Sequence, residues 1–147
     1  MRVLLKYRDL VRPGQLAQEL VAVAKSIREL QALLRDGTKT RFITVTRAAE
    51  SPRLETERLL KRLRQLQLTT SAVVVNALTI QPGTCVRCQT VAAAERRSLT
   101  ALRRTLRRSG RAAGQCAIIQ APLVAPPPTG VVALERWGGQ WKFEVKS

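Results

Sequence analysis

Apolar residues recur at alternating steps of four and three along the first third of the chain. Their positions are Leu16, Leu20, Val23, Ile27, Leu30 and Leu34. This spacing predicts an α-helix with one apolar stripe, which begins after Pro13-Gly14 and ends at Asp36-Gly37, where glycine is the usual left-handed residue past the last turn. Because the stripe lasts under three heptads, the pattern favours a helix packed on a core over a coiled coil.

Three short runs of β-branched and apolar residues predict strands. They cover residues 41–46 (Arg-Phe-Ile-Thr-Val-Thr), 71–76 (Ser-Ala-Val-Val-Val-Asn) and 116–120 (Cys-Ala-Ile-Ile-Gln). The second run is apolar without alternation, which is typical of a central parallel strand covered on both faces. Residues 141–145 alternate between apolar and polar side chains, so a small edge strand is expected there.

Two further helical patterns separate these strands. In the first, Ser51-Pro52 resembles an N-cap followed by proline at the first helical position, and Glu57 and Lys61 form a favourable pair one turn apart. Its predicted buried face consists of Leu59, Leu60, Leu63 and Leu66. The second helix ends at Gly110, and its arginines are expected to cover the surface around one largely apolar face. That face consists of Val91, Glu95, Leu99, Leu102 and Leu106.

The alternation of helix and strand is typical of an α/β fold, with a parallel sheet flanked by helices. Three core strands are recognisable, whereas a sheet usually has about five or six. The 147 residues are therefore expected to form one domain that holds part of a larger sheet. We divide it into a helical segment over residues 1–36, an α/β half over residues 40–137 and a short tail over residues 138–147.

The chain is strongly basic, with 26 lysine and arginine residues against 10 acidic residues and a net charge of +16. Such a chain attracts polyphosphates, nucleic acid or anionic lipid. It contains no histidine, which excludes Ser-His and Cys-His catalysis and histidine-ligated metal within the chain. It also contains neither G-x-x-x-x-G-K-[ST] nor G-x-G-x-x-G, so no glycine-rich loop of these residues wraps a phosphate.

The composition favours a cytoplasmic protein. Lys6, Arg8 and Asp9 interrupt the apolar start of the sequence too early for a signal peptide. No apolar run approaches the roughly 18 residues that a membrane span requires. The three cysteines, two of them in a C-x-x-C spacing, fit a reducing compartment better than a disulfide scaffold.

Asn76 is the first candidate for a binding residue. It ends the most buried predicted strand, and open α/β sheets bind ligands at the carboxyl ends of their strands. A side-chain amide offers one donor and one acceptor, which match the edge of adenine. The alternative is a strand-end asparagine that caps a turn, and the spacing by itself leaves both interpretations open.

Cys85 and Cys88 are the second candidates. Two thiolates bind one metal ion, but a structural zinc site requires four ligands. The pair is therefore either a redox couple or one half of a site that two chains share across a twofold axis. Cys116, within a predicted strand, is interpreted as a small buried hydrophobe.

The arginines of the helix between Arg96 and Arg108 are the third candidates. They either contact phosphates or form the ordinary solvated face of an amphipathic helix, and the sequence favours the solvated face. Aromatic residues make up 3% of the chain, so the stacking platforms of single-strand binders are scarce.

Four segments, in order and with matching spacing, resemble the C-terminal part of the ArsA-type family, which comprises arsenite-translocating ATPases and ATPases that target tail-anchored membrane proteins. Two of them are residues 40–46 followed by Glu-Thr-Glu-Arg-Leu-Leu at 55–60, and Val-Val-Val-Asn-Ala-Leu at 73–78. The others are Cys-Val-Arg-Cys-Gln at 85–89, and Pro-Leu-Val-Ala at 122–125 with Gly130 and Leu134 beyond it. Ala48-Ala49 and Pro126-Pro127 stand where the family has Pro-Glu and Gly-Glu.

The resemblance implies the C-terminal part of a P-loop NTPase-type sheet that binds ATP. In that case Asn76 contacts adenine, and the loop at Pro122 and Leu123 closes over the base. It also implies that Cys85 and Cys88 hold zinc between two subunits. The family's phosphate-binding loop, its switch regions and its Mg²⁺ site have no counterpart in these residues. We therefore expect a C-terminal portion that does not hydrolyse ATP alone.

The expected partners follow from the same resemblance. They are a nucleotide, a second copy or a complementing N-terminal half, and a membrane pump or a membrane-protein client. Two other function classes stay open. One is a small basic protein that binds nucleic acid by nonspecific electrostatics through the Arg96–Arg108 face, and the other is a noncatalytic dimerisation module that acts through Cys85 and Cys88.

Overall fold

A computed structural model describes residues 13–109 and 116–144 of the chain. These residues divide after Thr40 into two compact units. The first contains α2 (Pro13–Arg35), the helix that the apolar spacing predicts. Leu20 and Ile27 are 62% and 50% exposed, and nothing else in residues 13–40 covers this face of α2. The first unit therefore does not itself supply the core on which this face is expected to pack.

The second unit is built on a sheet with the strand order β1 (Phe42–Arg47), β2 (Thr70–Leu78), β3 (Ala117–Pro122) and β4 (Lys142–Glu144). The first three strands are parallel, and β4 runs antiparallel to β3. The predicted α/β fold with a mainly parallel sheet is therefore confirmed. β2 extends two residues beyond Asn76, past the predicted end of that strand.

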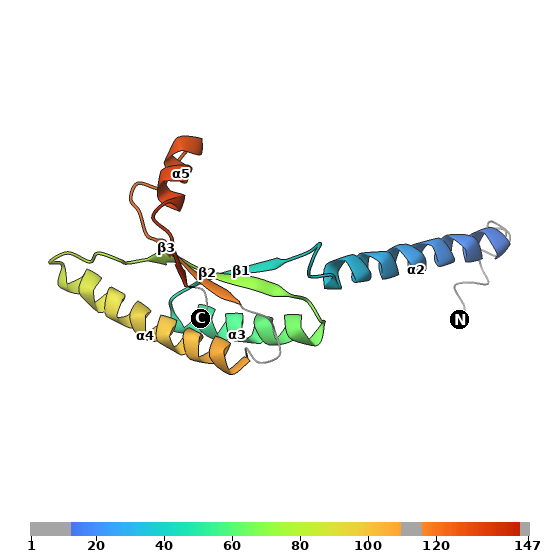
Figure 1. Ribbon diagram of the computed structural model, residues 1–147, viewed down its shortest axis with the longest axis horizontal. Coiled ribbons are helices and arrows are strands. Elements are labelled where there is room, and N and C mark those ends of the chain that lie inside the picture. Colours follow the sequence, from blue (N-terminus) through green and yellow to red (C-terminus); the bar gives the residue numbers. More distant parts are fainter. Residues whose placement is uncertain (1–12, 110–115, 145–147) are drawn as a thin grey trace, which may run out of the picture. The chain divides into compact units, whose positions relative to one another are not determined.

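Two helices cover one face of the sheet. They are α3 (Glu50–Gln65), between β1 and β2, and α4 (Val86–Ser109), between β2 and β3. Figure 1 shows them side by side along the same side of the strands, as right-handed crossovers between neighbouring parallel strands require. Gly110 and Val145, at the predicted ends of a helix and of the tail strand, lie outside the described residues. The core consists of Leu60, Val73, Val75, Leu78, Leu99, Leu102 and Ile118.

The ends of α3 differ from the sequence prediction. The helix begins at Glu50, with Ala49 at the N-cap position and no side-chain cap, so Ser51 and Pro52 lie inside the first turn. Proline is tolerated there because the N–H groups of the first turn have no partner within the helix. The predicted N-cap at Ser51 is therefore wrong by two residues. At the other end, Leu66 follows the last helical residue and is exposed, so it does not belong to the buried face.

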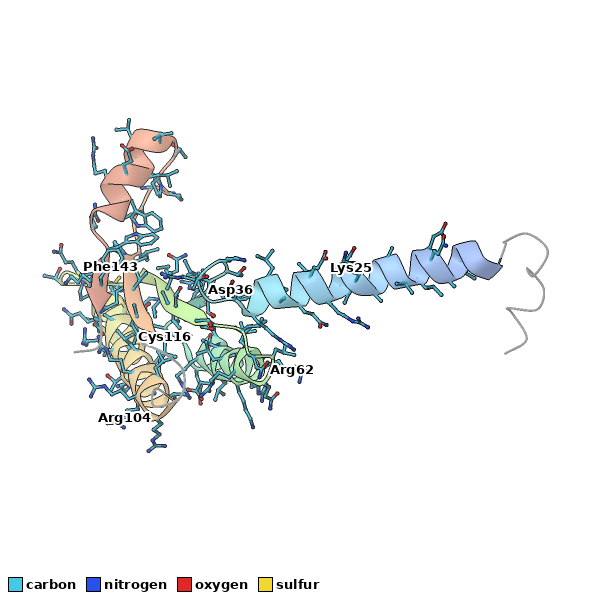
Figure 2. All side chains as sticks on the ribbon, turned by 45° about the vertical axis from the view of Figure 1, so that its right-hand side comes forward. Lys25, Asp36, Arg62, Arg104, Cys116 and Phe143 are labelled. Atoms are coloured by element: carbon cyan, nitrogen blue, oxygen red, sulfur yellow. The ribbon has the colours of Figure 1, made fainter. Side chains whose placement is uncertain are left out.

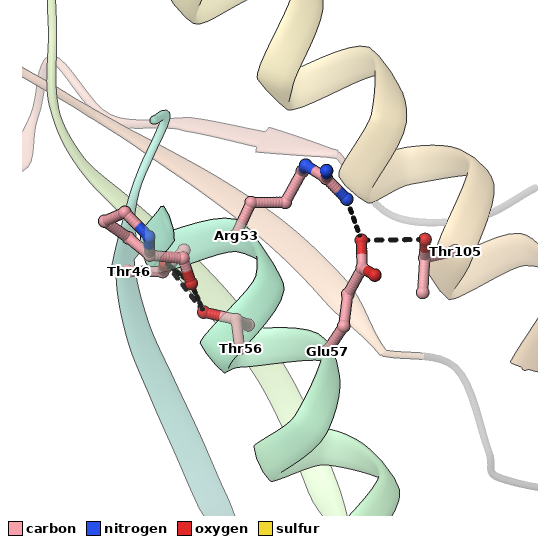
Figure 3. Close-up of polar contacts among 6 residues, drawn as sticks. Thr46, Arg53, Thr56, Glu57 and Thr105 are labelled. Carbon is pink, nitrogen blue, oxygen red and sulfur yellow. Dashed lines mark hydrogen bonds and ion pairs between the residues drawn. The ribbon is translucent and has the colours of Figure 1, made fainter. Parts of the chain in front are cut away.

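The buried face of α3 is narrower than predicted and partly polar. Leu60 and Thr56 are buried, whereas Leu59 is 46% exposed. The hydroxyl oxygen of Thr56 lies 2.7 Å from both the hydroxyl of Thr46 and the carbonyl oxygen of Pro52 (Figure 3). Buried hydroxyl groups require such partners. These contacts therefore let a polar residue take a core position between α3 and β1.

Glu57 connects α3 to α4. Arg53, one turn earlier, donates to its Oε1 at 2.5 Å, and the hydroxyl of Thr105 on α4 lies 3.0 Å from the same oxygen (Figure 3). Glu57 therefore pairs with Arg53 instead of the predicted Lys61. Arg53 is the partner because it and Glu57 are both mostly covered at the contact between the helices, whereas Lys61 is exposed.

Arg103 does not belong to the solvated face on which the sequence placed it. Its Nε donates to Oε2 of Glu144 on β4 at 2.8 Å, and a second bond runs from Nη2 to the other carboxylate oxygen. Gln120 of β3 donates to the same carboxylate. Paired bonds between a guanidinium and a carboxylate are among the stronger polar contacts. This contact joins α4 to the edge strand.

The face of the sheet opposite α3 and α4 carries an apolar row. Val45, Val74, Ile119 and Phe143 lie in register across the four strands. Val45 and Phe143 are 64% and 65% exposed, so no helix within residues 41–109 and 116–144 covers the ends of this row. Parallel sheets normally have helices on both faces. This unit therefore presents an apolar sheet face that requires a further layer.

The last helix, α5 (Val131–Gly138), follows β3 and lies apart from α3 and α4, near the end of the sheet where β3 finishes (Figure 1). It brings Trp137 next to the residue that ends β3. Within the described ranges, no helix has both the length and the apolar character that crossing a bilayer requires.

Replacing Leu102 by alanine is expected to destabilise the second unit by about 2–5 kcal/mol, because the loss of a buried leucine leaves a cavity. The side chain of Leu102 is 3% exposed, whereas that of Leu54, on the outer side of α3, is 40% exposed. Leu54→Ala is therefore the matched control, and its cost should stay below about 1 kcal/mol. Urea unfolding followed by circular dichroism measures both variants, and equal losses would show that Leu102 is not part of the core.

Candidate functional site

The strand β2 carries a bulge where it approaches the carboxyl edge of the sheet. The register between β2 and β3 shifts between Val75 and Leu78, so that Asn76 and Ala77 oppose one residue of β3. Ala77 has a φ of 57°, a left-handed conformation that residues other than glycine rarely adopt. Bulges redirect side chains and are common beside binding sites, and this one sets the direction of Asn76.

Asn76 is half-buried, and its side-chain Oδ1 accepts a hydrogen bond from the backbone N–H of Ala77 at 2.8 Å. This contact is the turn-capping role that the sequence analysis gave as an alternative. It uses one lone pair of the carbonyl oxygen. A side-chain amide also has a second lone pair and two N–H donors, and in the described part of the chain these donors bond to no other group. Asn76 therefore keeps hydrogen-bonding capacity for a ligand.

A cavity of about 520 Å³ lies beside Asn76, between the end of β1 and α3. Thr46, Arg47 and Glu55 contribute polar groups to its lining. Pro122 and Leu123 do not line it. The structure therefore brings the predicted adenine-contacting residues to neighbouring strands at one edge of the sheet, but it does not place them in one cavity.

The loop after β3 is attached to β2 and to α5. The backbone N–H of Leu123 donates to the carbonyl oxygen of Leu78 at 2.8 Å. The indole N–H of Trp137 donates to the carbonyl oxygen of Pro122 at 3.0 Å, and its ring meets that of Trp141 edge to face with centroids 4.9 Å apart. Sequence reasoning missed Trp137, although a signal was present, since the chain has two tryptophans and both support this loop.

Glu95 also went unnoticed as a positioning residue. The sequence predicts it on one face of the helix with Leu99 and Leu102, and its carboxylate accepts the backbone N–H of Thr79 at 2.8 Å. Thr79 directly follows β2. The contact therefore fixes the chain just beyond the carboxyl end of the central strand and helps to hold the bulge in place.

Cys85 and Cys88 lie at the start of α4, and both are exposed. The backbone N–H of Cys88 donates to Sγ of Cys85 at 3.4 Å. This hydrogen bond, followed by one from the Cys88 thiol, lowers the pKa of Cys85. The pKa of Cys88 is raised, first by its hydrogen bond to Cys85 and then by the charge of the Cys85 thiolate. The two thiols are therefore chemically distinct.

The structure provides two sulfur ligands at this position and keeps Cys116 apart from them. Burial raises the pKa of Cys116, but the residue is half-buried and directly precedes β3, so it is less covered than the buried strand residue that the sequence predicts. Among the described residues, no group of three or more His, Cys, Asp or Glu side chains is arranged to hold a metal ion. The described residues thus offer the two thiols of Cys85 and Cys88, half of the four ligands that a structural zinc site requires.

The chain matches a known protein family. The family model described as anion-transporting ATPase matches residues 1–138 of the chain, a span that includes Asn76, the cysteine pair and the loop at Pro122 and Leu123. No curated protein matches the chain.

Cys85 is expected to react with iodoacetamide faster than Cys88 near neutral pH. The thiolate is the reacting form, and the lowered pKa of Cys85 puts a larger share of it in that form at a given pH. The difference should close as the pH rises above the pKa of both thiols. Trypsin cleaves after Arg87, so mass spectrometry follows the two cysteines on separate peptides. Equal rates, or a faster Cys88, would contradict the hydrogen-bond direction described above.

Proposed function

Because the chain belongs to the anion-transporting ATPase family, we propose that it forms the adenine-binding part of an ATP-hydrolysing assembly. One observation carries this proposal. The bulged end of β2, with Asn76, lies directly beside the loop that begins at Pro122 and Leu123. Ligands of open α/β sheets bind at this edge.

In this proposal Asn76 reads the base. Its Nδ2 donates to a ring nitrogen of adenine, and the second lone pair of Oδ1 accepts from the exocyclic amino group. The bond from Ala77 holds the amide in one orientation. Leu123 is 57% exposed and is available to cover the face of the base, while Trp137 holds the neighbouring carbonyl of Pro122 in place.

The phosphates and Mg²⁺ are assigned to residues outside these 147. The sequence of the 147 residues contains no glycine-rich phosphate loop. Phosphoryl transfer depends mainly on positioning and charge stabilisation at the phosphates. The proposal therefore includes a complementing portion or a second copy. Two features support it, namely the apolar sheet face around Val45 and Phe143 and the edge position of β1 in the strand order. Both surfaces favour a packed neighbour.

The family's description names anion transport, which favours a transported anion and its membrane pump as client over a membrane-protein tail. The three free cysteines fit the reducing conditions of the cytoplasm. We therefore place this assembly in the cytoplasm.

Binding experiments with adenosine and ATP test the adenine site. The dissociation constants for the two ligands are expected to agree within about threefold, roughly 0.7 kcal/mol, because the chain contacts the base and not the phosphates. Asn76→Asp keeps the shape of the side chain but removes its N–H donors, and it should weaken adenosine binding by about tenfold. Tryptophan fluorescence reports the binding, since Trp137 contacts the loop at Pro122.

Gln65→Glu is the matched control, because it makes the same amide-to-acid change on an exposed residue at the end of α3. Its adenosine affinity should equal that of the unchanged chain. Adenosine binding that is indifferent to Asn76→Asp would contradict the assignment of the base site. ATP binding that is much tighter than adenosine binding would instead show a phosphate site within this chain.

The proposal extends to zinc at Cys85 and Cys88. Both thiols are exposed and adjacent at the first turn of α4, which suits two ligands of one metal ion. A second copy related by a twofold axis supplies the other two thiolates without any further residue type. Such a zinc ion would act as a structural link between the two copies.

Zinc content is expected to reach about half an atom per chain and to rise with the fraction of dimer. Cys85→Ser or Cys88→Ser should abolish both zinc and dimer, whereas Cys116→Ser, the matched control, should leave them intact. Elemental analysis of fractions separated by gel filtration measures both quantities. One zinc ion per monomeric chain would contradict a shared site, and a reversible disulfide between Cys85 and Cys88 without metal would support the redox alternative.

A further inference from the structure

A basic surface covers the outer side of α3 and α4 where both helices finish. The two helices run in the same direction, since each returns from the end of one parallel strand to the start of the next. Contact between Glu57 and Thr105 places the last turns of α4 beside the middle of α3. Figure 2 shows Arg62 and Arg104 on the outer sides of these helices. The basic surface consists of six exposed residues, Lys61, Arg62, Arg64, Arg104, Arg107 and Arg108.

Acidic residues do not neutralise this surface. Glu55 and Glu57 pair with Arg58 and Arg53 within α3, and Glu144 pairs with Arg103. Residues 96–134 contain no Asp or Glu at all. Within residues 13–109 and 116–144, none of the six side chains of the basic surface forms an ion pair.

Two ordinary roles of surface arginine explain only part of this cluster. Cations near the end of a helix interact favourably with its dipole, but that effect is confined to about the last turn, and Arg104 lies five residues before the end of α4 at Ser109. Charged surface residues also keep a protein soluble, but mixed charges of both signs serve that role. Six neighbouring charges of one sign repel one another, so a polyanion that binds here would relieve this repulsion.

The charge density of the surface resembles that of a nucleic-acid duplex. Arg104 and Arg108 are about one helical turn apart, roughly 6 Å along the axis of α4. Packed helix axes lie about 8–10 Å apart, so the backbone positions of the six residues fall within a patch of about 10 Å in each direction. A duplex carries one negative charge per about 1.7 Å of its axis, hence about six charges over the same length.

We infer that the basic surface binds the phosphate backbone of double-stranded nucleic acid without reading its sequence. Five of its six residues are arginines, whose planar guanidinium donates two hydrogen bonds to one phosphate. Neither α3 nor α4 contains an aromatic residue, which argues against the stacking that single strands require. Leu60 and Leu102 lie in the core, and all six residues of the basic surface are charged, so this surface itself has no apolar side chain to insert into a membrane.

This inference does not depend on the adenine site. The basic surface lies where α3 and α4 return to the starts of β2 and β3, whereas Asn76 lies near the opposite, carboxyl edge of the sheet. Nucleotide and duplex would therefore bind at separate places on the second unit.

Fluorescence anisotropy of a labelled random-sequence duplex, titrated with the full chain at several salt concentrations, tests the inference. The plot of log K against log salt concentration should fall with a slope of about −0.9 per phosphate contacted. The triple substitution R104Q/R107Q/R108Q should flatten this slope by about 2.7 if all three side chains contact phosphates. The control R87Q/R136Q/K142Q removes the same charge elsewhere in the second unit and should leave the slope unchanged.

Equal losses in both triple variants would overturn the inference, because bulk charge alone would then account for binding. Tighter binding to a single strand than to the duplex would also overturn it, as would binding to phosphatidylserine vesicles without binding to the duplex.

A second measurement uses the unchanged chain, so its result does not depend on whether the variants fold. Bound duplex should protect Lys61 from acetylation while Lys25 and Lys142 stay reactive, and an unprotected Lys61 would contradict the inference.

Discussion

The burial of β2 beneath α3 and α4 is the constraint on which the rest of the second unit depends. Val73 and Val75 are completely buried in the middle of the sheet, and Leu60 and Leu102 close the core from the two helices. A parallel pair of strands requires a crossover helix that packs back on the sheet. The order of β1, β2 and β3 and the position of both helices on one face follow from this packing.

The same packing gives the sheet two chemically different ends. At the carboxyl edge, a bulge and a loop held by Trp137 present Asn76 and Leu123. At the other end, α3 and α4 finish in a dense group of arginines. Polar contacts at the border of the core, such as those of Glu57 and Glu144, attach the helices to each other and to the edge strand. Asn76, Leu123 and the arginines at the other end all lie outside the apolar core.

Much of this architecture could be predicted from local patterns, because apolar periodicity and runs of β-branched residues report which face of an element is buried. Contacts between distant residues could not. Arg103 meets Glu144 across 41 positions and Trp137 meets Pro122 across 15, and no local pattern encodes either pair. The position of Asn76 at the carboxyl edge was predicted, but the bulge that directs it depends on the register between two strands, which neither strand specifies alone.

The most direct test of the adenine assignment is a nuclear magnetic resonance titration of the full chain, labelled with nitrogen-15, with adenosine and with ribose 5-phosphate. Adenosine should shift the side-chain amide of Asn76, the backbone amide of Leu123 and the indole N–H of Trp137, because these groups border the proposed base site. Ribose 5-phosphate should leave all three in place. An Asn76 side-chain signal that ignores adenosine, or that responds equally to both compounds, would contradict the account.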